Sequence, residues 1–402
     1  MKTVGIIAEY NPFHNGHKYQ IEYIKQKLHA DHIVVVMSGD FVQRGTPAFI
    51  DKYSRTQMAL ELGVDIIFEL PVFYATASAE GFAMGGVSLL HNLGFVDQLC
   101  FGCENDDLEL LETIAEILVT EPKEFSTCLQ AELQKGNSYP TARQKALQSV
   151  LPSSKNLEKL LMAPNNILAI EYLKALKRLN SNIQPVPLLR KDADYHNVEL
   201  SGSIVSASAI RTEYFKNKNL PSLSDYLPSR ALKILSDKEN KTFPVTISDF
   251  DSIIYYKLSS IEDFTKYLDV TPDIENKMKK LISPNITFQG FVEHMKTKNL
   301  THSRVSRILL HILLDIRKNQ YSDTCNYARI LGLRKTSSTL LKNVKNFPII
   351  TKVATAEKQL NVEDFKQFQL DLFSSHLYQN ICYKKFRTDM PTEPQHSPII
   401  LD

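Results

Sequence analysis

Two histidines at the start of a helix are the residues best suited to chemistry in this sequence. His14 and His17 flank Gly16 in a polar segment that follows a predicted strand and opens a predicted helix. The first turn of a helix offers unpaired N–H groups and a partial positive charge, which favour a phosphate. Two imidazoles beside a glycine, which lets the backbone come close, can converge on one phosphate. This suits nucleotidyl transfer, in which such donors stabilise charge at the α-phosphorus of ATP as pyrophosphate leaves.

The alternatives for this pair are a metal site or ordinary surface histidines. An HxxH pair can bind zinc, but no third ligand stands nearby in the sequence and the HExxH glutamate is absent. We therefore predict no protein-built metal site and favour transfer chemistry. Cys100 and Cys103 spell CxxC without a second pair at zinc spacing, and a buried strand accounts for both.

Alternating strands and helices must position the histidines. Residues 33–36 are an uninterrupted β-branched run, typical of a parallel strand covered on both faces. The pattern predicts strands at 3–9, 32–37, 65–70, 98–102 and 185–190, and helices at 16–29, 52–62 and 80–93. This order predicts an α/β fold with a Rossmann-like, doubly wound parallel sheet, whose ligands bind at the carboxyl ends of the strands.

The second half of the chain has a different texture. Beyond about residue 216, loops rich in Asn, Ser and Pro alternate with amphipathic helices. We predict a nucleotide-binding catalytic domain at 1–215, with a helical insertion at about 108–180, and a mainly helical domain at 216–402. The tail after Phe386, with three prolines, is expected to be a loosely packed end.

Composition sets the class of protein. The 402 residues are 43% hydrophobic and 23% charged, close to the globular average, which excludes wholesale disorder. No run of about 18 apolar residues occurs, so we expect no membrane span and no membrane partner. The first residues do not resemble a secretory signal, and five scattered cysteines suit a reducing compartment. We expect a soluble, cytoplasmic protein.

The net charge of +2 hides a strongly basic block. Residues 277–345 carry fourteen Lys or Arg against three acidic residues. Clustered cations repel one another unless an anion neutralises them, so this block predicts an anionic partner such as RNA. The alternative is a basic but merely solvated helical surface.

Several longer segments carry a family resemblance. They are GIIAEYNPFHNGHKY at 5–19, VMSGDFVQRGTPAFIDKYSRTQMA at 36–59, FGCE at 101–104 and APNNILA at 163–169. Together they resemble the bacterial tRNA(Met) cytidine acetate ligase family of HIGH-type nucleotidyltransferases. Over the first 215 residues the resemblance is close. It extends to the rest by general layout.

The resemblance implies a two-step reaction. ATP and acetate would give acetyl-adenylate and pyrophosphate, with Mg²⁺ screening the triphosphate. The N4 amine of the wobble cytidine in elongator tRNA(Met) would then take the acetyl group and become N4-acetylcytidine. Two other functions stay open: a small-molecule adenylyltransferase of coenzyme or NAD synthesis, and a catalytically inactive RNA-binding protein.

The resemblance also implies which residues contact ATP. They are Ile7, Ala8, Glu9, Tyr10, Asn11, Pro12, Phe13, His14, Asn15, Gly16, His17, Lys18, Tyr19, Gln20, Gly102, Asn165, Arg190 and Lys191. Gly102 would leave room for adenosine, or is a simple turn glycine. Asn165 could pair with adenine, or cap the helix that follows. Arg190 and Lys191 would contact phosphate, or are a solvated pair. Ser206, Ser208 and Arg211 resemble the second phosphate-binding element of the superfamily, although capping alone explains the serines.

Asp40 completes the predicted catalytic set with His14 and His17. It follows a strand and would hold Mg²⁺ or orient the cytidine amine, unless it only caps a loop. Around it, Gln43, Arg44, Lys52 and Arg55 would form a cationic rim, although a plain helix surface also explains the last two.

The basic block supplies the candidate tRNA contacts. The charged candidates are Lys277, Lys279, Lys280, Arg304, Arg307, Arg317 and Lys318. Phe291, Tyr321 and Tyr327 would be available to stack on bases. No recognised RNA-binding motif accompanies them.

Overall fold

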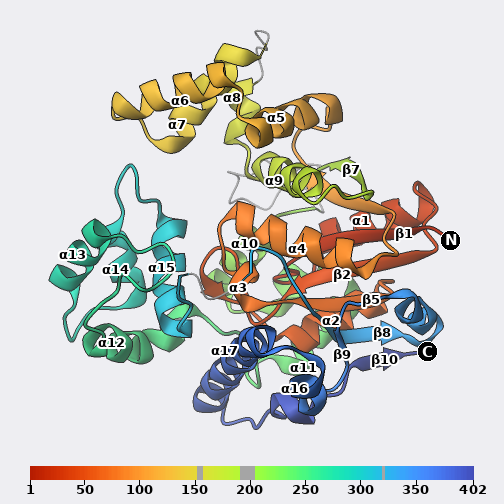
Figure 1. Cartoon of the computed structure of the whole chain (residues 1–402). Coiled ribbons are helices and arrows are strands. Elements are labelled where there is room, and N and C mark those ends of the chain that lie inside the picture. The colour runs from red at the N-terminus through yellow and green to blue at the C-terminus, as the bar shows by residue number, and fades with distance from the viewer. Residues whose placement is uncertain (152–156, 191–203, 319–321) are drawn as a thin grey trace.

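An eight-stranded, mostly parallel sheet forms the centre of the computed structural model, which describes residues 1–151, 157–190, 204–318 and 322–402 (Figure 1). The strand order is β10-β8-β5-β2-β1-β6-β7, and β9 also pairs with β8. The strands are β1 (Thr3–Ala8), β2 (His32–Ser38), β5 (Ile66–Leu70), β6 (Gln98–Cys103), β7 (Gln184–Leu189), β8 (Ala328–Arg334), β9 (Ile349–Ile350) and β10 (Ile399–Leu401). A separate hairpin pairs β3 (Phe41–Val42) with β4 (Thr46–Pro47). The predicted α/β fold is confirmed.

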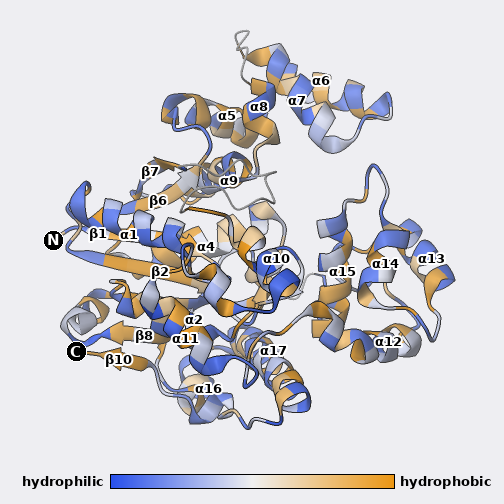
Figure 2. Ribbon diagram, turned by 180° about the vertical axis from the view of Figure 1, so that it is seen from behind, coloured by the Kyte–Doolittle hydropathy of each residue, from blue (hydrophilic) through white to orange (hydrophobic). Residues whose placement is uncertain are grey.

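Helices cover both faces of this sheet, as the β-branched run in β2 predicts. Val34 and Val36 face one apolar core, while Ile33 and Val35 face another. The first core is covered by α4 (Ala79–Leu93) and α9 (Pro164–Arg178), and the second by α1 (Asn15–Gln26), α2 (Lys52–Glu61), α10 (Ala207–Asn217) and α11 (Ser229–Lys238). Figure 2 shows hydrophobic residues concentrated on β2 and β8, with hydrophilic ones on outer helices such as α6 and α7.

Two groups of helices extend from the sheet. The first, which is formed by residues 108–151 and 157–162 of the predicted insertion, stands beyond α9 (Figure 1). It comprises α5 (Leu108–Thr120), α6 (Lys123–Gln134), α7 (Tyr139–Val150) and α8 (Leu157–Met162). The remainder of that predicted insertion is α9, which packs on the sheet. The second group has its own apolar core and comprises α12 (Asp251–Ser260), α13 (Pro272–Leu281), α14 (Phe288–Met295) and α15 (His302–Leu314). Among the described residues, no helix is long and apolar enough to cross a membrane.

The end of the chain differs from the expected helical domain with a loose tail. β8 inserts beside β5 in the antiparallel sense, and β10 pairs in parallel with β8. The long helix α17 (Val362–Phe386) and the short helices α3 (Val72–Ala75) and α16 (Ala356–Gln359) pack nearby. β8 escaped prediction because Arg329 and Arg334 bracket its apolar residues and made the segment read as part of a basic surface. The prediction of a loosely packed tail was wrong, since Glu393 in this segment is fully buried.

A buried cluster of four charges fixes this tail to the sheet. The Lys52 ammonium lies 2.7 Å from the Glu69 carboxylate and 3.0 Å from that of Glu393. Arg329 pairs with both carboxylates, at 3.1 Å from Glu69. Although burial alone would raise the pKa of Glu393, Lys52 and Arg329 outweigh it and lower that pKa to about 2. Charges so far from water are tolerated only because each has a partner.

Removing one charged side chain of this cluster should therefore make the protein easier to unfold. Lys52→Met leaves two buried carboxylates facing Arg329 alone, and we expect the free energy of unfolding to fall by about 3–5 kcal/mol. Urea denaturation measures this loss. The matched control is Lys358→Met on α16, where the side chain is exposed and the change should stay within about 0.5 kcal/mol. Equal urea midpoints for the two variants would contradict the proposed role of the cluster.

Candidate nucleotide-binding site

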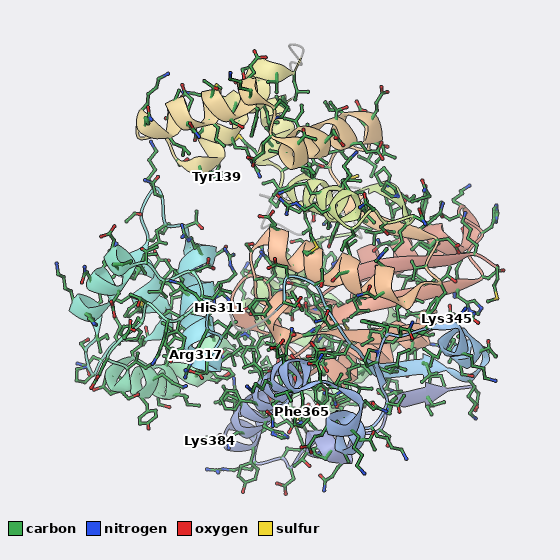
Figure 3. The ribbon with its side chains drawn as sticks, viewed as in Figure 1. Tyr139, His311, Arg317, Lys345, Phe365 and Lys384 are labelled. Carbon is green, nitrogen blue, oxygen red and sulfur yellow. The ribbon has the colours of Figure 1, made fainter. Side chains whose placement is uncertain are left out.

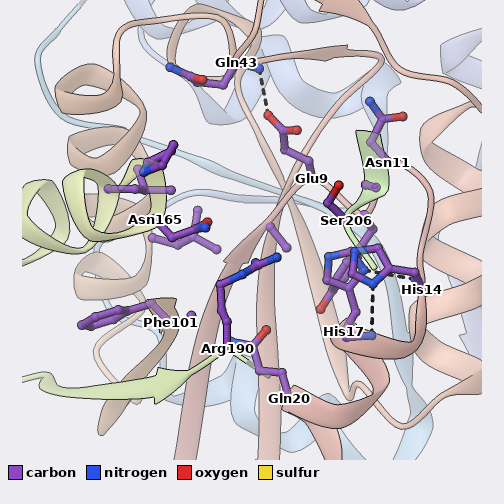
Figure 4. Close-up of a pocket in the computed structure, with 18 of the residues that line it drawn as sticks. Glu9, Asn11, His14, His17, Gln20, Gln43, Phe101, Asn165, Arg190 and Ser206 are labelled. Carbon is purple, nitrogen blue, oxygen red and sulfur yellow. Dashed lines mark hydrogen bonds between the residues drawn. The ribbon is translucent and has the colours of Figure 1, made fainter. Parts of the chain in front are cut away.

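A cavity of about 340 Å³ opens at the carboxyl ends of β1, β6 and β7 (Figure 4). Within the sheet, β2 lies on one side of β1 and β6 lies on the other side of β1. The strand order therefore reverses at β1, and open α/β sheets bind their ligands at such a point. The hairpin of β3 and β4, the first turn of α9 and the first turn of α10 close the sides.

His14 and His17 cap helix α1 reciprocally. The backbone N–H of Gly16 donates to Nδ1 of His14 at 3.0 Å, and that of His14 donates to Nδ1 of His17 at 3.2 Å. The two rings stack with their centroids 3.8 Å apart. Because Nδ1 of each ring accepts a hydrogen bond, the proton of each neutral ring must sit on Nε2. Within the described part of the chain, Nε2–H of neither ring makes a hydrogen bond, and both rings line the cavity.

Both imidazoles are held in the neutral form. Burial, followed by the positive charges of Arg190 and Arg211, lowers the pKa of His14 to about 3. Burial, His14 and Arg190 lower the pKa of His17 well below its usual value. The pair consequently offers directed N–H donors at neutral pH, while the arginines supply the charge.

Glycine is required at position 16 because the His14 ring packs directly against it. A Cβ atom at position 16 would lie 2.8 Å from Cε1 and 3.0 Å from Nδ1 of that ring. Any side chain would therefore displace the ring from its capping position. The predicted importance of this glycine is explained by ring packing inside the motif.

The predicted second phosphate-binding element lies across the cavity, at the start of α10. Ser206 caps this helix, since its Oγ accepts a hydrogen bond from the Ala209 N–H at 3.2 Å and lies 2.9 Å from Oγ of Ser208. Arg211, one turn on, donates to the Asn11 carbonyl at 2.5 Å. Capping and cavity lining thus coincide at Ser206, Ser208 and Arg211.

Asn165 lines the cavity, and of its two predicted roles the helix cap is wrong. The N-cap of α9 is Ala163, which has no side-chain cap, so Asn165 does not cap the helix. The Glu104 carboxylate instead accepts the backbone N–H groups of Asn165 and Asn166, at 3.3 and 2.9 Å. In turn, Oδ1 of Asn166 accepts hydrogen bonds from the backbone N–H groups of Glu104 and Asn105. This exchange ties α9 to the end of β6 and presents Asn165 to the cavity.

Most of the other predicted ATP contacts also line the cavity. They are Ile7, Ala8, Glu9, Tyr10, Asn11, Tyr19, Gln20, Gly102 and Arg190. A Cβ at Gly102 would meet only the Arg190 side chain, at 3.5 Å, so this protein itself does not demand glycine there. Gln43 and Arg44 line the cavity as predicted for the rim.

Some predicted residues lie elsewhere. Pro12 and Phe13 are buried beside the cavity, and Phe13 belongs to the core under the sheet. Asn15 bonds to Tyr226 and Asp225, and exposed Lys18 faces Glu22. Lys191 lies outside the described residues.

Asp40 is also absent from the lining. It is buried, accepts the Lys52 backbone N–H at 2.9 Å, and has its pKa raised by burial to about 6. Lys52 and Arg55 are fully buried and form no rim, because Lys52 serves the charge cluster and Arg55 donates to backbone carbonyls of Glu9, Ser38 and Gly39.

The apolar wall of the cavity was not predicted. It consists of Val42, Ala79, Phe82, Phe101, Leu168, Tyr172, Leu188 and Ile204. Apart from Ile204 in a loop, these residues come from strands and helices whose apolar positions read as ordinary core, so no signal in a single sequence distinguishes them. Together with the donors opposite, the wall forms a site for a molecule with an aromatic or apolar end and a charged phosphate end.

Comparisons with known proteins match nearly the whole chain to one family. A family model of HIGH nucleotidyl transferases matches residues 1–393. A tRNA(Met) cytidine acetate ligase of Thermoanaerobacter sp. strain X514 is 42% identical over 390 residues, 96% of each chain. That of Acetivibrio thermocellus is 38% identical over 399 residues, also 96% of each. The chain belongs to the tRNA(Met) cytidine acetate ligase family of HIGH nucleotidyl transferases.

Two solved structures match the whole chain. The apo crystal structure of Thermotoga maritima TmcAL covers all of both chains with a TM-score of 0.94 and 31% identity. The same protein bound with alpha-thio ATP matches with a TM-score of 0.91 and 30% identity, again over all of both chains. The predicted family membership is confirmed.

The predicted tRNA contacts divide into exposed and structural residues. Lys279, Lys280 and Lys318 are exposed, and Arg304 is half-buried at the start of α15. Lys277 donates to the Met295 carbonyl, and Arg317 pairs with Asp315 at 2.9 Å. Most of the Arg307 side chain is buried, which lowers its pKa.

The basic block is not a single face. Arg317 and Lys345 lie on opposite sides of the molecule (Figure 3). Beyond residue 318, Arg329 and Arg334 serve the sheet, since Arg329 joins the charge cluster and Arg334 donates to the Val64 carbonyl at 3.2 Å. Buried Phe291 and Tyr327 are core residues, so their predicted stacking role was wrong, and Tyr321 lies outside the described residues.

The capping and ligand-binding roles of His14 can be separated. Asparagine is a good helix N-cap, so His14→Asn keeps the cap while removing the Nε2–H donor. We expect the free energy of unfolding to change by less than about 1 kcal/mol, while the Kd for ATP rises at least about tenfold. Calorimetric titration with ATP measures the affinity. Unchanged ATP affinity would contradict the assignment of the ring as a ligand.

Proposed function

We propose that this chain is an ATP-dependent tRNA(Met) cytidine acetate ligase. The observation that carries the proposal is the full-length match to relatives of that name, combined with an intact pair of helix-capping histidines in the cavity. The match extends through the helices and strands of the second half, so it is not a likeness of the nucleotide-binding half alone.

The first step activates acetate. An acetate oxygen attacks the α-phosphorus of ATP, the bond to the β-phosphate oxygen breaks, and pyrophosphate leaves, giving acetyl-adenylate. The Nε2–H groups of His14 and His17 donate to phosphate oxygens as charge builds on them, and Arg190 and Arg211 neutralise the triphosphate. These donors are already oriented by the caps, so little reorganisation is needed at the moment of reaction.

Magnesium fits this site as a companion of ATP. Among the described residues, no group of three or more His, Cys, Asp or Glu side chains could hold a metal ion. Mg²⁺ keeps most of its water and binds phosphate oxygens well. The ion would therefore enter on the triphosphate and screen part of its charge.

The second step transfers the acetyl group to N4 of the wobble cytidine of elongator tRNA(Met), with AMP as the leaving group. The basic helices α13 to α15 support this step by their position. Gly45, in the turn of the hairpin that lines the cavity, has a positive φ of 78°, and a Cβ there would lie 2.5 Å from the Arg307 backbone nitrogen. RNA bound along α15 would thus lie beside the cavity. Because tRNA is used in the cytoplasm, we also propose that the protein acts there.

The deciding experiment follows pyrophosphate release from ATP. We expect this release to require acetate. We also expect nucleoside analysis to detect N4-acetylcytidine in tRNA(Met) that has been incubated with the protein, ATP and acetate. Release that required a mononucleotide and ignored acetate would instead indicate a small-molecule adenylyltransferase. ATP binding without any release would indicate an inactive RNA-binding protein.

The RNA surface has its own test. Arg304→Glu on α15 should weaken tRNA(Met) affinity several-fold, and the slope of log affinity against log salt should fall by about one. Filter binding at several salt concentrations measures both quantities. The control is Lys123→Glu on α6, which is also a charge reversal, at an exposed position, and should change neither. Equal affinities for the two variants would place the RNA elsewhere.

A further inference from the structure

The cavity holds one carboxylate among cations. Glu9 is the only acidic side chain among its described lining residues, which also include Arg44, Arg190 and Arg211. A carboxylate repels the phosphates of ATP, so Glu9 does not serve as a phosphate ligand. Its presence calls for a partner that carries a proton or a positive charge.

The backbone holds Glu9 in place. It directly follows β1, and its Oε1 accepts the backbone N–H of Gln43, in the hairpin, at 2.9 Å. Within the described part of the chain, Oε2 makes no hydrogen bond. Burial lowers the pKa of Arg211, and the nearby Glu9 carboxylate opposes this shift, so the two charges favour each other. Glu9 is therefore an oriented anion with one acceptor oxygen to spare.

The carboxylate lies at the end of the cavity away from the histidines. Figure 4 shows Glu9 reaching toward Gln43, while His14 and His17 gather at the opposite end. The Gln43 end belongs to the hairpin that contacts α15 through Gly45. The histidines thus occupy one end of the cavity, and its one described carboxylate faces the side nearest the basic helices.

We propose that Glu9 is a catalytic residue that accepts a proton from the exocyclic amine of the incoming cytidine. This inference rests on the proposed function. The amine nitrogen bonds to the acetyl carbon, the bond from that carbon to the AMP oxygen breaks, and AMP leaves with the electron pair. The nitrogen gives up one proton to Oε2 of Glu9, so the product is a neutral amide. A positioned base is useful here because the amine lone pair is delocalised into the pyrimidine ring.

Asp40, which the sequence suggested for orienting the amine, is excluded from this role by its burial. Its carboxylate lies outside the cavity and accepts the Lys52 backbone N–H. Glu9 instead combines exposure to the cavity with a fixed orientation. The acceptor of the second step therefore comes from the strand end that leads into the histidine motif.

The two half-reactions separate this role from others. Glu9→Gln keeps an oxygen to accept the Gln43 N–H and removes the proton acceptor together with its negative charge. Acetate-dependent exchange of pyrophosphate into ATP reports the first step, and single-turnover acetylation of tRNA(Met) reports the second. We expect the ratio of acetylation to exchange to fall at least about 100-fold in Glu9→Gln. Glu9→Asp, which retains a carboxylate, should recover part of that ratio. The matched control is Glu357→Gln at an exposed position on α16, where the ratio should stay at its wild-type value.

Three results would overturn the proposal. The first is acetylation by Glu9→Gln at the wild-type rate. The second is an equal fall in exchange and acetylation, which would place Glu9 in the first step or in folding. The third is exchange restored by higher Mg²⁺ concentration, which would make Glu9 a metal ligand. Absence of exchange in the wild-type protein would instead overturn the proposed function, so the two failures are distinct.

Discussion

The reciprocal cap of helix α1 is the constraint on which the site depends. By using Nδ1 of both His14 and His17 to satisfy backbone N–H groups, the helix start leaves only Nε2 of each ring to act outward. Burial beside Arg190 keeps both rings neutral, so they are donors of fixed direction. Gly16 is required for the same reason, since a Cβ would strike the first ring. One local motif thus sets tautomer, charge and orientation together.

The strands and the histidine motif could be predicted because their signals are local. The β-branched residues of β2 and the segment from His14 to His17 each carry their meaning within a few positions. Asp40, Lys52 and Arg55 read as cleft and rim residues by the same logic. In the structure Asp40 accepts the Lys52 backbone N–H and Arg55 donates to backbone carbonyls, so both are buried. Lys52 is buried because Glu69 and Glu393, the latter 341 residues away, pair with its ammonium. No window of sequence displays such partners.

The two halves of the chain are joined in ways that a boundary near residue 215 does not convey. β8 and β10 complete the sheet that begins with β1, and the charge cluster fixes the segment around Glu393 beneath it. The hairpin at Gly45 touches α15 while its neighbours line the cavity. A basic helical surface is thereby held next to a nucleotide site, which is the arrangement that a tRNA-modifying enzyme of this kind requires.

The central claim is that two neutral imidazoles grip the triphosphate through Nε2. A crystal structure of the protein with α,β-methylene-ATP and Mg²⁺ tests it most directly. The account predicts Nε2 of both His14 and His17 within about 3.2 Å of phosphate oxygens, with Nδ1 of each ring still accepting its backbone N–H. Rings turned away from the phosphates, or caps broken on binding, would contradict it.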